Sequence, residues 1–393
     1  MTQEIIIHQT PDYIQVALCQ AGQVQEIEME ALQTEMRVGD IYYAKVVRLL
    51  PDLGVAFVEI GGERTALLHF TDVCLPTGSG YTETAQYLRV GQFLIVQINK
   101  LPRGDKGAVV TGFVQLIGAL LIYQPGRNQL KVAQRIVADT ERQRLSAIFQ
   151  QENITAAGIM VRSLAEEQTA ENLLQELQHL QNEWQQVQTL AKEQRKPGLL
   201  RAEYNLACRF IRDRVNSGLS SIYADDPNCY AELNHYMNTW LWSWLPCLHS
   251  IAAKRSPWRT YKIDAVIEEA QSKKIGLPSG GFIVIERTEA MITVDVNTGQ
   301  YVQGKRERDI VYQTNLEAAR VLAKQLRIRN LGGIIVIDFI GMREMAQQQD
   351  VLAVLKEELA QDPAYTTLYG FTPLGLVEIS RQRRGNSWVE FYK

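Results

Sequence analysis

The chain has 393 residues, of which 46% are hydrophobic and 22% charged, and its formal net charge is −3 at pH 7. This length is too great for one ordinary core and indicates two to four domains, while the composition excludes a disordered chain. Because the total charge is slightly negative, any attraction to phosphate has to come from local basic patches.

The cysteines are scattered, with no Cys-x-x-Cys pair among them. They are Cys19, Cys74, Cys208, Cys229 and Cys247. This spacing argues against a zinc site and is typical of reduced thiols in a cytosolic compartment. No apolar run reaches membrane-spanning length, and the N-terminus lacks a basic region followed by an apolar one. We therefore expect a cytoplasmic protein that does not contact membranes.

The first 35 residues alternate between apolar and polar side chains in three short runs separated by polar turns. The runs are Ile5–Ile7, Tyr13–Leu18 and Val24–Ile27. Alternation of this kind indicates β-strands. Three short strands are too few to be stable alone, so we expect them to pair with a segment from elsewhere in the chain.

A series of short strands with glycine at the corners follows, from Val38 to Asn99. This pattern favours a small closed barrel of the OB type. Such barrels bind single-stranded nucleic acid through an exposed aromatic ring and nearby cations. Phe57 and Lys106 are the candidates here, although a core phenylalanine and a solvated loop lysine are the alternatives.

Beyond Ile117 the pattern changes to a mixture of strands and helices. We expect a strand-like stretch at 129–136, a helix from Thr140 to Gln151, a strand at 158–162 and a long Gln- and Glu-rich helix at 170–195. The segment 200–260 is expected to be helical. Its tryptophans are expected in a core; they are Trp240, Trp242, Trp244 and Trp258.

Two apolar, β-branched runs near the C-terminus each carry an aspartate toward their far end, namely Asp295 and Asp338. An ionised carboxylate in this position needs a compensating partner, and a divalent cation such as Mg²⁺ satisfies two of them. Asn297 lies two residues after Asp295 and hence on the same strand face, where its amide can orient the carboxylate. The alternative is that each aspartate only caps the next turn or helix.

An amphipathic helix is expected between these two runs, from Asn315 to Arg329. The order strand, helix, strand allows a crossover that brings both aspartates to one edge of a sheet. The C-terminal stretch from Arg381 to Arg384 is basic, and we expect it to be solvated or to contact phosphate.

These segments resemble the catalytic core of the ribonuclease E/G endoribonucleases. The matching motifs are Gly276–Gly281, Asp295-Val-Asn297, Thr314–Ala319, Gln325-Leu-Arg, Leu331-Gly-Gly, Ile335–Ile340 and Leu376–Arg383. The resemblance covers nearly the whole chain and is strongest from about Ile263 to Arg383. Several long motifs in the same order are much more specific than a single short motif.

The resemblance implies an α+β multidomain fold with four parts. Residues 1–35 plus 200–268 would form a split ribonuclease-H-like domain, residues 36–118 an OB-fold RNA-binding barrel, residues 119–199 a 5′-sensor region and residues 269–393 a DNase-I-like α/β catalytic domain. The relatives usually continue into a Cys-x-x-Cys element that shares a zinc ion between subunits, and the sequence in hand ends before it. Oligomerisation through a shared zinc is therefore not expected.

The resemblance also implies roles for individual residues. Asp295 and Asp338 would bind magnesium, with Asn297 supporting Asp295. Phe57 and Lys106 would hold RNA on the barrel, although the family's second aromatic is replaced by Leu67. Arg162 and Ser163 would bind a 5′ monophosphate, with Ser163 keeping the hydroxyl of the family's usual threonine.

The resulting prediction is an endoribonuclease of RNA processing and mRNA decay. It would hydrolyse single-stranded, AU-rich RNA to 5′-phosphate and 3′-hydroxyl ends, with Mg²⁺ as cofactor and Mn²⁺ as the alternative ion. The bacterial-type cytoplasm is the expected location, with an organelle stroma as the alternative. The competing hypothesis is an RNA-binding or ribosome-associated homologue with little or no cleavage activity.

Overall fold

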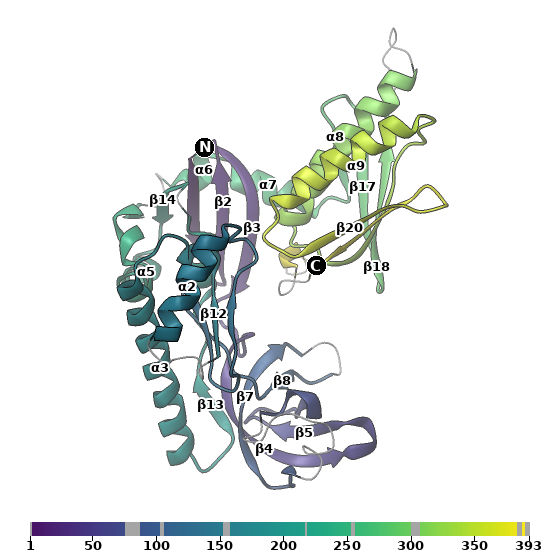
Figure 1. Cartoon of the computed structure of the whole chain (residues 1–393). Helices are drawn as coiled ribbons and strands as arrows, with labels where there is room; N and C mark the ends of the chain where they lie inside the picture. Colours follow the sequence, from purple (N-terminus) through teal and green to yellow (C-terminus); the bar gives the residue numbers. More distant parts are fainter. Residues whose placement is uncertain are drawn as a thin grey trace. The chain divides into compact units, whose positions relative to one another are not determined.

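The structure is a computed structural model that describes residues 2–74, 87–102, 106–151, 158–216, 218–252, 256–299, 307–382 and 387–389. It is a mixed α+β protein with four sheets (Figure 1). The chain forms two compact units, one of residues 1–32, 217–233 and 246–393, and one of residues 33–216 and 234–245.

In the first unit, the N-terminal strands obtain partners from the second half of the chain. The five-stranded sheet has the order β15-β14-β1-β2-β3. Its strands are β1 (Gln3–Gln9), β2 (Tyr13–Gln20), β3 (Gln23–Ala31), β14 (Leu219–Ala224) and β15 (Leu248–Ser250). Because β1 pairs in parallel with β14, the first three strands are completed into a sheet large enough to be stable.

The second sheet of this unit carries the two aspartates and has the order β16-β17-β18-β19-β21-β20. Its strands are β16 (Lys274–Gly276), β17 (Phe282–Arg287), β18 (Met291–Asn297), β19 (Gly333–Asp338), β20 (Thr366–Phe371) and β21 (Val377–Arg381). The helices of this unit's C-terminal half are α6 (Pro257–Thr260), α7 (Ile263–Gln271), α8 (Glu307–Ile328) and α9 (Met345–Ala360). Helix α8 links β18 to the parallel strand β19, as the crossover requires.

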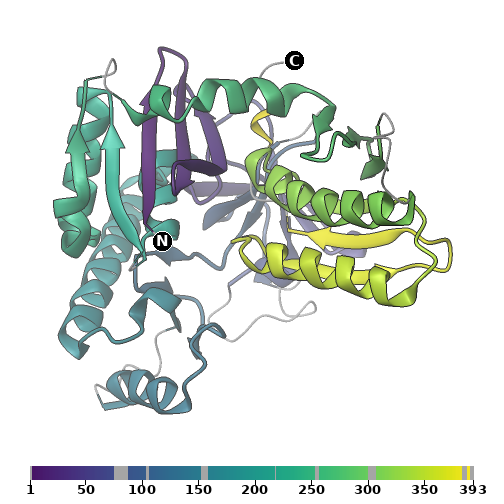
Figure 2. The ribbon, with the colours of Figure 1, turned by 90° about the horizontal axis from the view of Figure 1, so that it is seen from above.

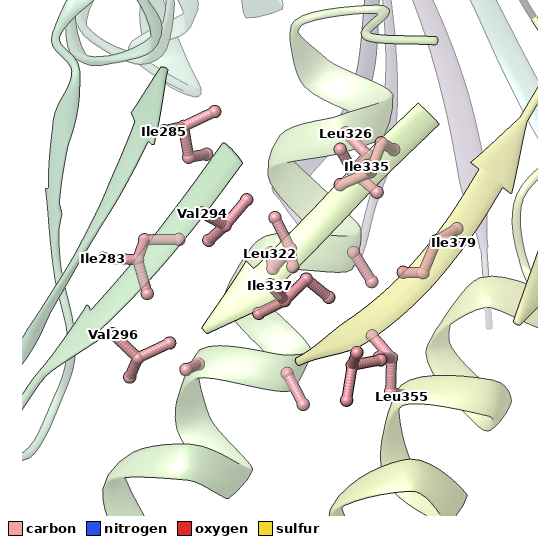
Figure 3. Close-up of a cluster of buried hydrophobic side chains, with 14 of the residues drawn as sticks. Ile283, Ile285, Val294, Val296, Leu322, Leu326, Ile335, Ile337, Leu355 and Ile379 are labelled. Carbon is pink, nitrogen blue, oxygen red and sulfur yellow. The ribbon is translucent and has the colours of Figure 1, made fainter. Parts of the chain in front are cut away.

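One face of this sheet is apolar and packs against α8 and α9, which lie side by side (Figure 2). Side chains alternate along each strand, so Ile292, Val294 and Val296 of β18 are buried while the residues between them are not. Figure 3 shows the strand side chains meeting Leu322 and Leu326 of α8 and Leu355 of α9. This core leaves the opposite face of β18 and β19 free to carry polar groups.

The second unit contains a closed five-stranded barrel that fits an OB fold. Its strands are β4 (Ile41–Leu50), β5 (Val55–Glu59), β6 (Ala66–His69), β7 (Phe93–Lys100) and β8 (Val109–Thr111). They follow the order β4-β5-β6-β8-β7, and pairing of β4 with β7 closes the barrel. Strand β13 (Gly198–Arg201) adds to the outer edge of β4.

A smaller four-stranded sheet, of order β11-β12-β10-β9, completes this unit. Its elements are β9 (Leu116–Ile117), β10 (Leu121–Gln124), β11 (Leu130–Val132), β12 (Gly158–Val161), α2 (Asp139–Gln151) and α3 (Ala170–Glu193). Helix α4 (Leu206–Arg214) follows β13, and α5 spans Pro227–Trp240. The Thr169 hydroxyl caps α3 by accepting the N–H of Asn172, and leucines on one helix face are buried.

The segment 200–260 is not helical throughout as expected, because it also contains the strands β14 and β15. Two expectations about single residues are wrong as well. Trp240 and Trp258 are buried, but Trp242 is 57% exposed because the chain leaves α5 there and enters a short 3₁₀ helix, η5 (Trp242–Cys247). Arg381 is neither solvated nor placed to contact phosphate, since it is 3% exposed and paired with the buried Asp362. Arg383 and Arg384 lie outside the described residues.

Within the described part of the chain, no helix combines the length and apolar character needed to span a membrane.

Candidate active site

The two aspartates are neighbours on the open face of the C-terminal sheet. In the parallel pairing of β18 with β19, the Cα of Asp295 lies opposite that of Asp338. Neighbouring strands are about 4.8 Å apart, so the two carboxylates share one small area of surface. Both residues are exposed. Like charges directly across a strand pair repel, and a shared cation would remove that repulsion.

Asn297 orients one of these carboxylates. Its side-chain amide Nδ2 donates a hydrogen bond of 2.8 Å to Oδ2 of Asp295. The bond is possible because residues two apart on a strand point to the same face. It limits the rotation of the Asp295 carboxylate and leaves the other oxygen, Oδ1, free of this contact.

A residue that the sequence did not single out for a role, Asn315 on α8, fixes the chain just after Asp338. Asn315 is fully buried, and its amide donates to the carbonyl of Ile340 at 2.8 Å and accepts the Ile340 N–H at 3.1 Å. The sequence signal was a polar Asn inside the apolar face of a helix. Such a residue is costly to bury unless it is fully hydrogen-bonded, as it is here.

The glycines before β17 pack against the end of β18. A Cβ on Gly281 would lie 2.7 Å from the carbonyl oxygen of Asn297, and Gly299 has a φ of +70° with the carbonyl oxygen of Gly280 2.3 Å from its Cβ position. Only glycine fits both positions without a clash. These glycines therefore allow the backbone around Asn297 to pack closely.

The donor atoms at this site fit a hard divalent cation. Two carboxylates and a supporting amide provide oxygen ligands, and Mg²⁺ is usually bound through one or two carboxylates, with water and substrate phosphate completing its shell. No group of three or more His, Cys, Asp or Glu residues suited to a metal was found among the described residues.

The barrel residues lie in the second unit. Phe57 on β5 is half-buried on the barrel exterior, opposite Leu67 on β6 and Arg48 on β4. Lys106 is exposed and lies just before Gly107, whose Cβ position is 2.1 Å from the Thr65 carbonyl oxygen. Phe57 is thus partly accessible, and its register neighbour on β6 is the aliphatic Leu67.

Arg162 and Ser163 follow β12, at the edge of the small sheet. The Arg162 guanidinium donates to the Gly118 carbonyl oxygen at 2.5 Å and to Asp213 Oδ1 at 2.7 Å, and its backbone N–H bonds to the Leu120 carbonyl. Burial acts to raise the pKa of Asp213, but the charges of Arg212 and Arg162 hold it below its ordinary value. Arg162 is therefore a cation in a fixed orientation, with further N–H groups left for an anion.

Glu176 on α3 anchors the turn to which Arg162 is bonded. Its Oε1 accepts the backbone N–H groups of Leu120 and Leu121 at 2.8 Å each, and it leaves no room for a side chain at Gly118. Burial raises the pKa of Glu176 to about 7, although these hydrogen bonds act in the opposite direction.

This raised pKa predicts a loss of stability with rising pH. Between about pH 4.5 and 7 the folded state binds more protons at Glu176 than the unfolded state, so the free energy of unfolding falls across that window. The loss is up to about 3 kcal/mol above pH 7. We expect Glu176→Gln, which keeps the Oε1 acceptor, to reduce the fall and to raise the thermal midpoint at pH 8. An equal fall between pH 5 and 8 in both proteins would contradict this.

Comparison with known proteins adds independent information. Residues 115–384 match the sequence profile described as the Ribonuclease E/G family. The chain is 34% identical to ribonuclease G of Salmonella typhimurium over 396 aligned residues, which cover 98% of this chain and 81% of that protein. It is 33% identical to ribonuclease G of Haemophilus influenzae, covering 98% and 80%, and 34% identical to ribonuclease E of Nostoc sp., covering 96% and 55%.

Proposed function

Because the chain belongs to the ribonuclease E/G family, we propose that it is a magnesium-dependent endoribonuclease acting in RNA processing and decay. One observation carries the proposal: Asp295 and Asp338 are register neighbours on an open sheet face, with Asn297 bonded to one of them. This arrangement matches the need of phosphodiester hydrolysis for carboxylates that hold a cation beside the scissile phosphate.

In this mechanism, Asp295 and Asp338 would hold the cation, which would supply positive charge beside the scissile phosphate and help to activate the attacking water. Asn297 fixes the orientation of the Asp295 carboxylate by donating a hydrogen bond to its Oδ2. The buried Asn315 keeps the strand end that carries Asp338 in place. Attack of water oxygen on phosphorus forms the new P–O bond and breaks the P–O3′ bond; the attacking water loses one proton to solvent and O3′ takes one up from solvent, which leaves a 5′ phosphate and a 3′ hydroxyl.

Separate regions bind the RNA in this proposal. Phe57 stacks a base and Lys106 contacts the backbone on the barrel, because exposed rings and cations on such barrels suit single strands. Arg162 and Ser163 bind a 5′ monophosphate by charge-assisted and hydroxyl hydrogen bonds. The fixed orientation of the Arg162 guanidinium supports this role.

We assign the finer fold as follows. The sheet β15-β14-β1-β2-β3 belongs to a ribonuclease-H-like domain split across the sequence, and the sheet carrying the aspartates belongs to a DNase-I-like domain. The small sheet with Arg162 is the 5′-sensor region. A cytoplasmic location is favoured by five cysteines that are all free thiols and by the bacterial origin of the relatives.

A cleavage assay tests the function. We expect the protein to cut a labelled, AU-rich single-stranded RNA internally in Mg²⁺ and not in EDTA, and to cut a 5′-monophosphate RNA faster than the same RNA with a 5′ hydroxyl. Arg162→Gln should remove this difference while leaving cleavage of the 5′-hydroxyl RNA unchanged. Binding of RNA without internal cleavage in Mg²⁺ or Mn²⁺ would instead support an RNA-binding homologue that barely cleaves.

A further inference from the structure

The open face of the catalytic sheet carries a cation close to the two aspartates. The register across four strands places Lys274 of β16 opposite Val284 of β17, Val284 opposite Asp295, and Asp295 opposite Asp338. Ile275 and Ile283 are buried in the core, so their neighbours Lys274, Phe282 and Val284 point to the other face. Lys274 therefore stands in the same row and on the same face as the carboxylates.

Lys274 is held by an aromatic ring that belongs to this face. Its Nζ lies 3.7 Å from the centroid of the Phe282 ring. Phe282 in turn is the Cα partner of Asn297 in the pairing of β17 with β18. The ring that contacts the ammonium therefore belongs to the register neighbour of Asn297, and all three residues lie on strands instead of a loop.

The neighbouring lysine shows why this arrangement is unusual. Lys273 Nζ forms an ion pair of 2.9 Å with Glu286 Oε1. Lys274 Nζ has no carboxylate partner among the described residues. A ring face attracts an ammonium without adding a negative charge, so the charge of Lys274 is not offset by a carboxylate, whereas that of Lys273 is partly offset by Glu286.

We propose that Lys274, held over the Phe282 ring, binds the RNA backbone phosphate next to the scissile one. The row contains two carboxylates that repel a polyanion, and Lys274 provides the opposite charge on that surface. Its ammonium covers one face of the ring, so the contact is with phosphate and not with a stacked base. This inference rests on the proposed cleavage centre at Asp295 and Asp338, because it assigns a subsite to the same RNA.

The test compares the two adjacent lysines. Steady-state cleavage is measured for Lys274→Met, Lys273→Met, Lys274→Arg and Phe282→Leu, using RNA with a 5′ hydroxyl. We expect Lys274→Met to raise KM about five- to tenfold with kcat within about twofold, and Lys274→Arg to restore most of the loss. Lys273→Met should behave as the wild type, and Phe282→Leu should show a smaller rise in KM.

Binding is measured separately in an Asp338→Asn background, by fluorescence anisotropy over a range of KCl concentrations. Loss of one phosphate contact lowers the slope of log affinity against log salt by about 0.7 for a single strand. We expect this decrease for Lys274→Met and none for Lys273→Met. Equal effects of the two lysine variants would overturn the proposal. If the wild type does not cleave RNA but Lys274→Met still lowers the salt slope, the proposed activity is rejected. The contact between Lys274 and phosphate would then be supported without it.

Discussion

Asp295→Asn and Asp338→Asn are each expected to lower RNA cleavage by roughly a thousandfold or more. Asparagine keeps the size and the hydrogen-bonding oxygen of aspartate but removes the formal charge that holds the cation. The two residues lie opposite each other in register, so neither can replace the other. The measurement is the single-turnover rate on a 5′-hydroxyl RNA in saturating Mg²⁺.

Thermal unfolding separates this chemical loss from a folding defect. Without metal, each variant should unfold at the wild-type temperature or slightly above it, because one member of a like-charged pair has been neutralised. Added Mg²⁺ should stabilise the wild type and not the variants. Glu286→Gln, at an exposed carboxylate of the same sheet, is the matched control and should keep full activity. Retention of a tenth of the activity in either aspartate variant would exclude the two-carboxylate mechanism.

The parts of this fold that follow local patterns could be predicted from the sequence. The alternating runs before residue 35 became β1 to β3, and the stretch expected as a helix at 140–151 is α2, Asp139–Gln151. The closed barrel was also anticipated, because strand spacing and corner glycines are local signals. What these patterns could not show is which strands close the barrel, since pairing of β4 with β7 joins segments far apart in sequence.

In the candidate active site, too, local features could be predicted from the sequence and the pairing of distant segments could not. Asp295 and Asp338 were recognisable because each follows an apolar run, and a crossover helix between them was expected. Their register, however, depends on how β18 and β19 align, and one residue of slip would place one carboxylate on the opposite face. Lys274 was not recognised, because a lysine pair in sequence does not reveal that one member meets a ring and the other a carboxylate.

Arg381 shows why buried charges are the hardest residues to predict. In the sequence it belongs to a basic C-terminal stretch, and a solvated arginine is the ordinary expectation. Its partner Asp362 is 19 residues away, between α9 and β20, and nothing local in the sequence connects the two residues. The structure shows a two-pronged pair, with Nε to Oδ2 at 2.7 Å and Nη2 to Oδ1 at 3.0 Å, and a third bond to the Leu331 carbonyl at 2.6 Å.

Breaking the buried Arg381–Asp362 pair is expected to lower the free energy of unfolding more than breaking an exposed ion pair. Asp362→Ala leaves the Arg381 charge buried without its partner, and such changes lower the free energy of unfolding by about 3–5 kcal/mol. The exposed Lys273–Glu286 pair gives the comparison, since Glu286→Gln should cost about 1 kcal/mol or less. Urea unfolding of both variants measures the difference.

The physical origin of the loss can be tested with a double variant. If the cost comes from an uncompensated charge, Asp362→Leu combined with Arg381→Met should recover most of the stability lost in Asp362→Ala, because apolar side chains need no partner. If the bond from Arg381 to Leu331 matters more than the buried charge, the double variant, which lacks that bond, should be no more stable than Asp362→Ala, which keeps it. Because Arg381 lies opposite Gly333 at the start of β19, the second result would mean that this bond maintains the alignment of the strand that ends in Asp338.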